Sequence, residues 1–204
     1  MMIAGIILAA GSASRMGQPK QLLDWHGRPL VRVAAEEALV SSLDHVLVVL
    51  GSARDEVATA LAGLPLRLIE NVDYAAGQST SLRAGIAALE QDVAAAMILL
   101  GDQPFVTAAI IDRLVDAWRT SGAAIVAPSF RGQRGNPVLF SRAVFPELLA
   151  VTGDRGARDV LRADPARIEL VPFDDARPLV DIDTPEEYQR LRELNHEDTN
   201  RTKS

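Results

Sequence analysis

Short apolar segments alternate with segments of helical periodicity over residues 3–127. The apolar segments cover residues 3–9, 45–50, 66–69, 94–100 and 123–127. Each is too short for an independent helix and is typical of a strand that is buried on both faces. The segments between them, which carry apolar side chains at three- and four-residue spacing, are residues 30–40, 54–62, 79–90 and 108–121. This alternation predicts a doubly wound α/β fold: a mostly parallel sheet between two helical layers, with a ligand crevice at the carboxyl ends of the strands.

The pattern changes after Pro128. We expect a loop rich in Gly, Arg and Gln over residues 130–136. Short strands are expected over residues 137–140 and 168–172, and short helices over residues 141–150 and 155–163. A closing helix is expected over residues 184–194, because Thr184 and Glu187 form a capping-box pattern around Pro185. The sequence therefore predicts a single domain over residues 1–194 and a polar, disordered tail over 195–204.

Composition narrows the class of protein. The chain has 204 residues, 48% of them apolar and 24% charged, which is typical of one globular domain. It contains no Cys, which excludes disulfides and cysteine chemistry. The net charge of −6 argues against non-specific nucleic-acid binding. We expect a cytoplasmic protein without a membrane partner, because the N-terminal apolar run lacks a basic leader and no apolar stretch approaches about 20 residues.

The strongest functional signal is the segment LAAGSASRMGQPK at residues 8–20. It fits neither the P-loop pattern nor the dinucleotide fingerprint. Its small residues nevertheless let the backbone approach a ligand closely, and the backbone amides of such a loop form an anion-binding concavity. Arg15 and Lys20 add positive charge that suits a triphosphate. The alternative is a surface loop with two solvated cations.

Two carboxylates are candidate metal ligands. Asp102 follows the apolar segment 94–100, at the edge where α/β sheets bind ligands. One carboxylate beside phosphates suits Mg²⁺, which keeps several of its waters. Asp183 lies just before the closing helix, with Asp181 at the alternate position of the same segment. The alternative is that both residues are structural. Asp102 would then form a turn or cap a helix, and the negative charge of Asp183 would interact with the positive N-terminal end of the closing helix.

Hydroxyl and arginine clusters suggest further contacts. Ser79 and Ser81 open a predicted helix, where free backbone donors suit an anion or a base edge. Asn136, Arg155 and Arg158 lie in two later loops and would suit a phosphorylated second substrate, although ordinary solvation also explains such arginines.

Other polar residues predict structural roles. The histidines have no metal-binding spacing. Glu36 and Glu37, whose helix neighbours are Ala and Val, are expected on a solvated face.

Together these motifs resemble the MobA-like nucleotidyltransferases, most closely the molybdenum cofactor cytidylyltransferase branch. The resemblance extends from residue 3 to about residue 194 and rests on residues 8–17 with Lys20, on the Gly-Asp-x-Pro motif at Asp102, and on the Asp-Thr-Pro motif at Asp183. It implies a Rossmann-like nucleotidyltransferase fold. The implied activity is Mg²⁺-dependent transfer of a cytidylyl group from CTP to molybdopterin, with release of pyrophosphate and with a molybdoenzyme as a further partner.

The resemblance also implies residue roles. Arg15 and Lys20 would stabilise charge on the phosphates, and Asp102 and Asp183 would hold Mg²⁺. The implied nucleotide contacts are Leu8, Ala9, Ala10, Gly11, Ser12, Lys20, Ser79 and Ser81. The methyl group of Ala10 favours the cytidylyl over the guanylyl branch by resemblance. Asn136 stands where many relatives have His, which argues against an acid–base role at this position because an amide does not titrate near neutral pH.

Three alternatives remain open. The first two are enzymes: a guanylyltransferase of the same cofactor, and a nucleotidyltransferase of a sugar or alcohol phosphate. The third is a non-catalytic molybdopterin carrier, which would need the arginine loops but not Lys20 together with both carboxylates.

Overall fold

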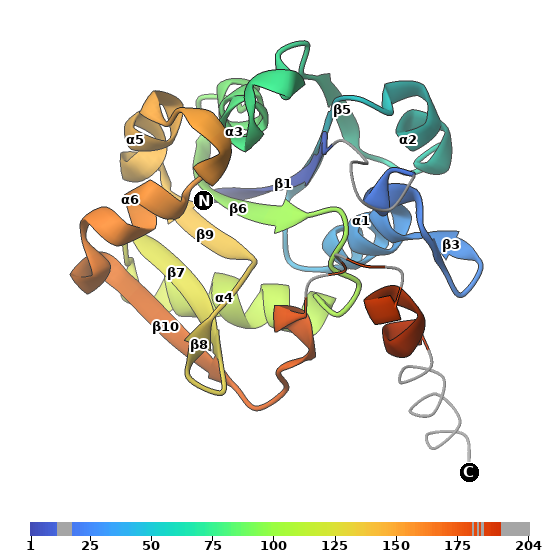
Figure 1. Ribbon diagram of the computed structural model, residues 1–204. Helices are drawn as coiled ribbons and strands as arrows, with labels where there is room; N and C mark the ends of the chain where they lie inside the picture. Colours follow the sequence, from blue (N-terminus) through green and yellow to red (C-terminus); the bar gives the residue numbers. More distant parts are fainter. Residues whose placement is uncertain (12–17, 181, 183, 185, 193–204) are drawn as a thin grey trace.

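The computed structural model describes residues 1–11, 18–180, 182, 184 and 186–192 (Figure 1). Its centre is an eight-stranded sheet in the order β10-β7-β9-β6-β1-β4-β5, with β8 paired to β7. The strands are β1 (Met2–Ala9), β4 (His45–Leu50), β5 (Arg67–Glu70), β6 (Val93–Leu100), β7 (Ile125–Phe130), β8 (Gln133–Arg134), β9 (Val138–Ser141) and β10 (Ile168–Phe173). A separate hairpin pairs β2 (Asp24–Trp25) with β3 (Arg28–Pro29).

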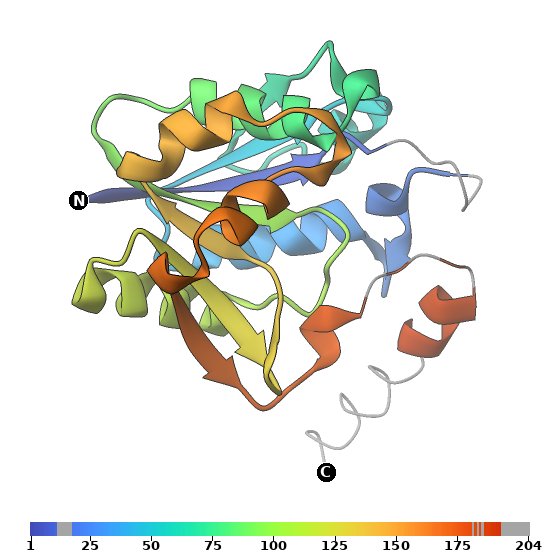
Figure 2. The same cartoon turned by 60° about the vertical axis from the view of Figure 1, so that its left-hand side comes forward.

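Helices cover both faces of the sheet (Figure 2). Their bounds are α1 (Leu30–Val40), α2 (Arg54–Ala60), α3 (Gln78–Ala87), α4 (Ala108–Ser121), α5 (Phe145–Ala150) and α6 (Arg158–Ala163). The helices α1, α2 and α4 share one hydrophobic cluster with the sheet, and α3, α5 and α6 share another on the opposite face. This arrangement confirms the predicted doubly wound, mostly parallel α/β fold.

The long apolar runs of the sequence follow from this two-sided burial. On β1, Ile3 and Ile7 pack into the cluster of α1, α2 and α4, whereas Ile6 packs into the cluster of α3, α5 and α6. All three side chains are fully buried. Because alternate residues of a strand point to opposite faces, both sets must be apolar when both faces are covered.

One feature of the sheet was not predicted. β9 runs antiparallel to both of its neighbours, β6 and β7, and so interrupts the parallel order. The short strand β8 forms within the stretch 130–136, which the sequence predicts as a loop, by pairing antiparallel with β7.

No helix among the described residues is long and apolar enough to cross a bilayer.

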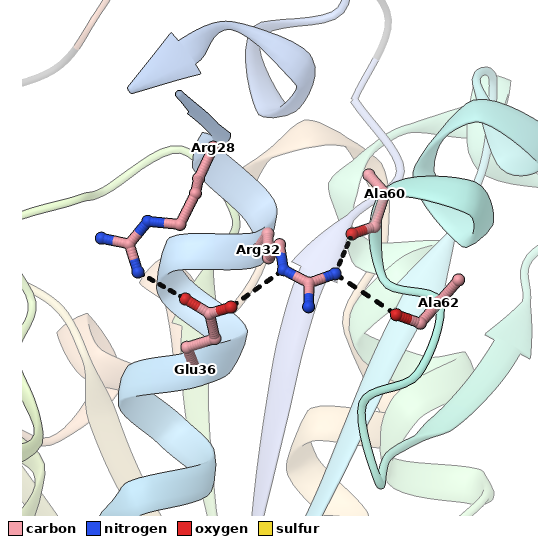
Figure 3. Close-up of polar contacts among 5 residues, drawn as sticks. All are labelled: Arg28, Arg32, Glu36, Ala60 and Ala62. Carbon is pink, nitrogen blue, oxygen red and sulfur yellow. Dashed lines mark hydrogen bonds and ion pairs between the residues drawn. The ribbon is translucent and has the colours of Figure 1, made fainter. Parts of the chain in front are cut away.

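Glu36 and Glu37 are partly exposed, and both have polar partners that the sequence does not predict. Glu36 accepts hydrogen bonds from Arg28 (Nη1 to Oε2, 2.6 Å) and from Arg32 (Nε to Oε1, 2.8 Å), as Figure 3 shows. Arg32 also donates to the carbonyl oxygens of Ala60 (2.9 Å) and Ala62 (3.3 Å), just after α2 (Figure 3). This network therefore ties α1 to the end of α2.

Glu37 has a different partner. Its carboxylate oxygen Oε2 accepts a hydrogen bond of 2.7 Å from the backbone N–H of Ala108. Ala108 is the first residue of α4, where backbone donors have no partner within the helix. Thr107, the N-cap residue of α4, forms no side-chain cap hydrogen bond, so Glu37 supplies this cap from α1. It also places a negative charge at the positive end of that helix.

The closing helix begins as predicted and includes residues 186–192. The hydroxyl of Thr184 accepts a hydrogen bond from the backbone N–H of Glu187 (3.2 Å), and the Glu187 carboxylate accepts one from the backbone N–H of Thr184 (3.0 Å). This reciprocal pair confirms the capping box. Tyr188 donates to the carbonyl oxygen of Asp24, so the helix lies beside the β2–β3 hairpin (Figures 1 and 2).

The ion pair between Arg167 and Glu147, which lies in α5, predicts that the stability of the fold depends on pH. Arg167 donates to Glu147 through two parallel hydrogen bonds of 2.7 and 2.5 Å, which lower the pKa of Glu147. A carboxylate with a lowered folded-state pKa stabilises the fold at neutral pH, and this contribution is lost as the pH falls below its usual pKa near 4.5. Because the Glu147 side chain is 43% exposed, we expect less than about 1 kcal/mol.

We therefore predict that Glu147→Gln lowers the free energy of unfolding at pH 7 by about 0.5 kcal/mol and has a smaller effect at pH 3, because the lowered pKa places the loss of this contribution below the usual pKa of the carboxyl group. Urea unfolding followed by circular dichroism measures this difference. Glu169→Gln is the control, since no ion pair is recorded for Glu169 among the described residues. An equal loss at both pH values would show that the pair stabilises the fold by packing rather than by charge.

Candidate active site

A cavity of about 400 Å³ lies at the carboxyl ends of β1 and β6. This nucleotide crevice, as we name it, brings together most of the residues that the sequence indicates for phosphate and metal binding. Predicted residues among its lining are Leu8, Ala9, Ala10, Gly11, Lys20, Ser81 and Asp102. The segments that carry them are far apart in the sequence and meet because the carboxyl ends of neighbouring parallel strands lie at one sheet edge.

The other predicted residues fall in three places. Ser12, Arg15 and Asp183 lie outside the described residues. Ser79 is described but is only 1% exposed and is absent from the crevice lining. Its hydroxyl has no hydrogen-bond partner within the described part of the chain. Asn136, Arg155 and Arg158 line a smaller neighbouring cavity.

The backbone of residues 9–11 is held in place by its neighbours. The side-chain amide of Gln21 donates to the carbonyl oxygens of Ala9 (3.1 Å) and Gly11 (3.2 Å), and Ser52 donates to that of Gly11 (3.0 Å). Gly51 approaches so closely that a Cβ there would lie 2.6 Å from the Ala10 carbonyl oxygen. Only glycine fits at this approach, so the loop leaves the sheet along a fixed path.

Asp102 is placed by the pairing of β6 with β1. Leu100 is in register with Leu8, and the backbone N–H of Gly101 donates to the Leu8 carbonyl oxygen (3.1 Å). Asp102 follows directly, is partly buried and lines the crevice. The carboxylate therefore lies beside the same loop that carries the backbone amides and Lys20.

The opposite wall of the crevice is the start of α3. Gly77 has a φ of +109°, and a Cβ at this position would lie 2.6 Å from the Asp154 carboxylate. The backbone N–H of Gln78 donates to the same carboxylate (3.2 Å), and all three residues line the crevice. Asp154 thereby joins α3 to the loop before α6.

The hydroxyls at this helix start have separate roles. Thr80 donates to the carbonyl oxygen of Gly77 (2.8 Å), which is a structural bond. Asn71 donates to the hydroxyl oxygens of Thr80 (2.8 Å) and Ser81 (2.9 Å) and is itself 5% exposed. Of the hydroxyls at positions 79–81, the one that lines the crevice is that of Ser81, and Asn71 fixes its orientation.

Gln21, Asn71 and Asp154 were not identified from the sequence. Gln21 follows Lys20 directly, so its position in the motif was a signal. Asp154 directly precedes Arg155, in a loop that the sequence indicates for the second substrate, but nothing in the sequence indicates its bond to α3. Asn71 lies in a segment without such a signal, and only the folded arrangement brings it to Ser81.

The smaller cavity has a volume of about 70 Å³ and adjoins the nucleotide crevice, with which it shares Leu8, Gln78 and Leu100. Arg155 forms an ion pair of 3.4 Å with Asp159, one turn away. The predicted second-substrate residues are therefore close to one another and to the crevice.

The carboxylates of the crevice suit a metal ion that takes most of its ligands from the substrate's phosphates and from water. Among the described residues, no group of three or more His, Asp and Glu side chains could hold a metal by itself. Mg²⁺ commonly takes one or two carboxylates and completes its shell with phosphate oxygens and water. The Asp102 carboxylate, beside the loop that follows β1, meets that requirement.

The fold and its crevice define an α/β protein with a ligand site at the carboxyl ends of its parallel strands. The sequence profile of the MobA-like NTP transferase domain matches residues 5–168, and the chain belongs to this family. The resemblance noted in the sequence is thereby confirmed.

Two curated relatives and one solved structure extend the comparison. The chain is 33% identical over 196 residues to nicotine blue oxidoreductase of Paenarthrobacter nicotinovorans, an alignment that covers 93% of the chain and 96% of the relative. It is 29% identical over 192 residues to molybdenum cofactor cytidylyltransferase of Escherichia coli K12, covering 92% and 94%. The crystal structure of Rv0371c from Mycobacterium tuberculosis H37Rv in complex with manganese is 30% identical, with a TM-score of 0.82 and coverage of 95% and 99%.

Proposed function

We propose that this protein transfers the cytidylyl group of CTP to the molybdenum cofactor, releasing pyrophosphate. Membership of the MobA-like family supports nucleotidyl transfer, and the Escherichia coli relative bears the name of the specific reaction. The observation that carries the proposal is the nucleotide crevice, where Lys20 and Asp102 meet the backbone of residues 8–11. A triphosphate needs such a combination of amides, cation and metal-binding carboxylate.

The reaction requires side chains only to align the two substrates and to neutralise charge on the phosphates. A phosphate oxygen of molybdopterin attacks the α-phosphorus of CTP, a new P–O bond forms, and the bond to the β-phosphate breaks. The bonding electrons leave with pyrophosphate. Because the attacking phosphate is already ionised at neutral pH, no general base is required, which agrees with an amide rather than a histidine at Asn136.

We assign the phosphate groups to the start of the loop. The amides of residues 8–11 would bind them, with Lys20 and Arg15 neutralising their charge. Asp102 and Asp183 would hold Mg²⁺, which supplies charge neutralisation on the α-phosphate and the leaving pyrophosphate. The manganese complex of Rv0371c supports a divalent metal in this family.

The remaining contacts divide between the two substrates. Ser12 is a proposed nucleotide contact with the rest of the loop, on the triphosphate side. Ser81, which lines the crevice, is the proposed contact with the base and sugar. Ser79 is 1% exposed and lies outside the crevice lining, so a contact from Ser79 would require α3 to shift at its start. Arg155 and Arg158, with Asn136, would bind the phosphate of the acceptor, since their cavity adjoins the crevice.

A thermal-shift comparison of CTP, GTP, ATP and UTP, each with and without Mg²⁺, tests this proposal. A ligand that binds only the native state raises the unfolding temperature by mass action. We expect a rise with CTP that requires Mg²⁺, and none with the other nucleotides. A rise with GTP alone would indicate guanylyl transfer, and no response to any nucleotide would indicate a molybdopterin carrier.

One relative is named an oxidoreductase, so we add NADH, a common hydride donor of oxidoreductases, as a further ligand in this comparison. Stabilisation by NADH without any response to nucleoside triphosphates would contradict the proposal. We expect the opposite, because the crevice sequence lacks a dinucleotide fingerprint.

Gln21 gives a further prediction for the same crevice. Gln21→Met keeps the length of the side chain but removes both hydrogen bonds to the loop. At about 1 kcal/mol for each bond, and with part of the loss absorbed by relaxation, we expect CTP to bind about tenfold more weakly. Isothermal titration calorimetry measures the Kd.

Ser52→Ala removes one bond to the same loop and should weaken binding about threefold. Unchanged affinity in Gln21→Met would show that the loop holds its shape without this side chain.

A further inference from the structure

A third cavity, of about 420 Å³, lies at the carboxyl ends of β7 and β10, on the face of the sheet that α4 covers. We name it the aromatic pocket. Its lining consists of Pro104, Phe105, Thr107, Ile110, Phe130, Phe173, Asp174, Asp175 and Arg177. It is similar in volume to the nucleotide crevice and opens at the same edge of the sheet, yet the nucleotide chemistry described above does not use it.

Planar groups form the walls of this pocket. Phe105 and Phe173 are each half-buried. The guanidinium carbon of Arg177, which lines the pocket, lies 5.5 Å from the centre of the Phe105 ring. Arg113 is not part of the lining; its guanidinium carbon lies 4.1 Å from the centre of the Phe173 ring and so supports that ring from outside the pocket. Phe130 is fully buried beneath, with its ring centre 5.3 Å from that of Phe173. Walls of this kind favour a flat, polarisable ring over an aliphatic chain.

The rim of the pocket carries two carboxylates, Asp174 and Asp175, which differ in their hydrogen-bond partners. Arg177 donates to Asp175 from Nε (2.8 and 3.0 Å), and this contact lowers the pKa of Asp175. Asp175 is therefore committed to holding Arg177 in place. Asp174 is exposed, and among the described residues its carboxylate has no recorded hydrogen bond or ion pair. It is available to accept hydrogen bonds from a ligand.

The pocket is connected to the reaction site by a short piece of chain. Asp102 lines the nucleotide crevice, and Phe105, three residues later, lines the aromatic pocket. At roughly 3.5 Å for each residue, their Cα atoms are at most about 10 Å apart. The ring of Phe105 is further held by Trp25, at a centre-to-centre distance of 5.5 Å. An acceptor whose phosphate lies where the crevice adjoins the small cavity of Arg155 and Arg158 could extend a ring on a short arm past Asp102 into the aromatic pocket.

We propose that the aromatic pocket binds the heterocycle of the acceptor substrate, a flat ring with a 2-amino-pyrimidinone edge that donates hydrogen bonds to Asp174. The identity of that heterocycle as a pterin rests on the proposed function. The small cavity at Arg155 and Arg158 is less suited to this role, because its volume of about 70 Å³ is one sixth of the 420 Å³ of the aromatic pocket.

Fluorescence titration with 6-hydroxymethylpterin tests the inference without any turnover. The unmodified protein should bind the pterin, and Phe173→Ala and Asp174→Asn should each weaken binding by at least tenfold. Asp174 is exposed, so Asp174→Asn should fold even if Phe173→Ala does not. Matched controls are Leu170→Ala, which is 51% exposed on the same strand, and the exposed Asp92→Asn; both should bind as the unmodified protein does.

Three results would overturn the inference. One is absence of pterin binding by the unmodified protein. Another is loss of binding in Arg158→Ala with retention in Phe173→Ala and Asp174→Asn, which would place the ring in the smaller cavity. The third is displacement of the pterin by guanosine at equal concentration, which would identify the pocket as a nucleobase site.

The outcome separates this inference from the proposed function. Pterin binding in a protein that gives no thermal response to CTP would contradict cytidylyl transfer and leave the pocket assignment standing. A Mg²⁺-dependent CTP response without pterin binding would contradict the pocket assignment alone.

Discussion

Asp102→Asn is expected to lower the rate of nucleotidyl transfer by about a thousandfold while the protein stays folded. The substitution keeps the shape of the side chain and removes the charge that would hold a divalent metal beside the phosphates. Because Asp102 lines a cavity and belongs to none of the hydrophobic clusters, we expect the substitution to leave the packing of the core intact. Pyrophosphate release measures the rate, and thermal unfolding checks the fold.

Asp154→Asn is the matched control for this experiment. Asp154 also lines the crevice, but its carboxylate accepts the backbone N–H of Gln78 and so holds the wall of the cavity. We expect a raised KM and a kcat within about tenfold of the original, because the amide oxygen of Asn still accepts a hydrogen bond. If Asp102→Asn remained fully active, or if Asp154→Asn were the inactive variant, the metal assignment to Asp102 would be wrong.

Lys20→Met should lower kcat/KM by about a hundredfold or more. Lys20 begins the 3₁₀ turn Lys20–Leu22 and lines the crevice next to Gly11. Methionine preserves the apolar stem of the side chain, so the change isolates the ammonium charge.

The ligand series provides the control for Lys20. The charge acts on phosphates, so CTP should bind the variant much more weakly, whereas cytidine should bind both proteins equally. Calorimetric titration of CTP, CMP and cytidine measures this gradient. An equal loss for CTP and cytidine would contradict the assignment and would indicate that the substitution deforms the base site instead.

The layered fold was predictable because burial on both faces leaves a continuous apolar run in each central strand. The alternation of these runs with amphipathic helices then fixes a doubly wound sheet. The antiparallel direction of β9 was not predictable, because Val138–Ser141 would carry the same buried side chains in either direction. Direction depends on the path of the connecting chain rather than on strand periodicity.

The main part of the site was predictable for a related reason. Residues 8–11 and Asp102 follow neighbouring parallel strands, so their convergence is a consequence of topology. Contacts from a side chain to a distant backbone group were not predictable. Gln21, which holds the loop, and Glu37, which caps α4, act on partners that helix and strand periodicity do not identify.

The central claim is tested most directly by incubating the protein with α-labelled CTP, the molybdenum cofactor and Mg²⁺ or Mn²⁺. We predict that the label appears in a dinucleotide form of the cofactor, together with stoichiometric pyrophosphate, and that chelation of the metal stops both. Failure to transfer label from CTP while GTP or another nucleotide supports transfer would contradict the cytidylyl assignment. Failure with every nucleotide, in protein that binds the cofactor, would contradict nucleotidyl transfer itself.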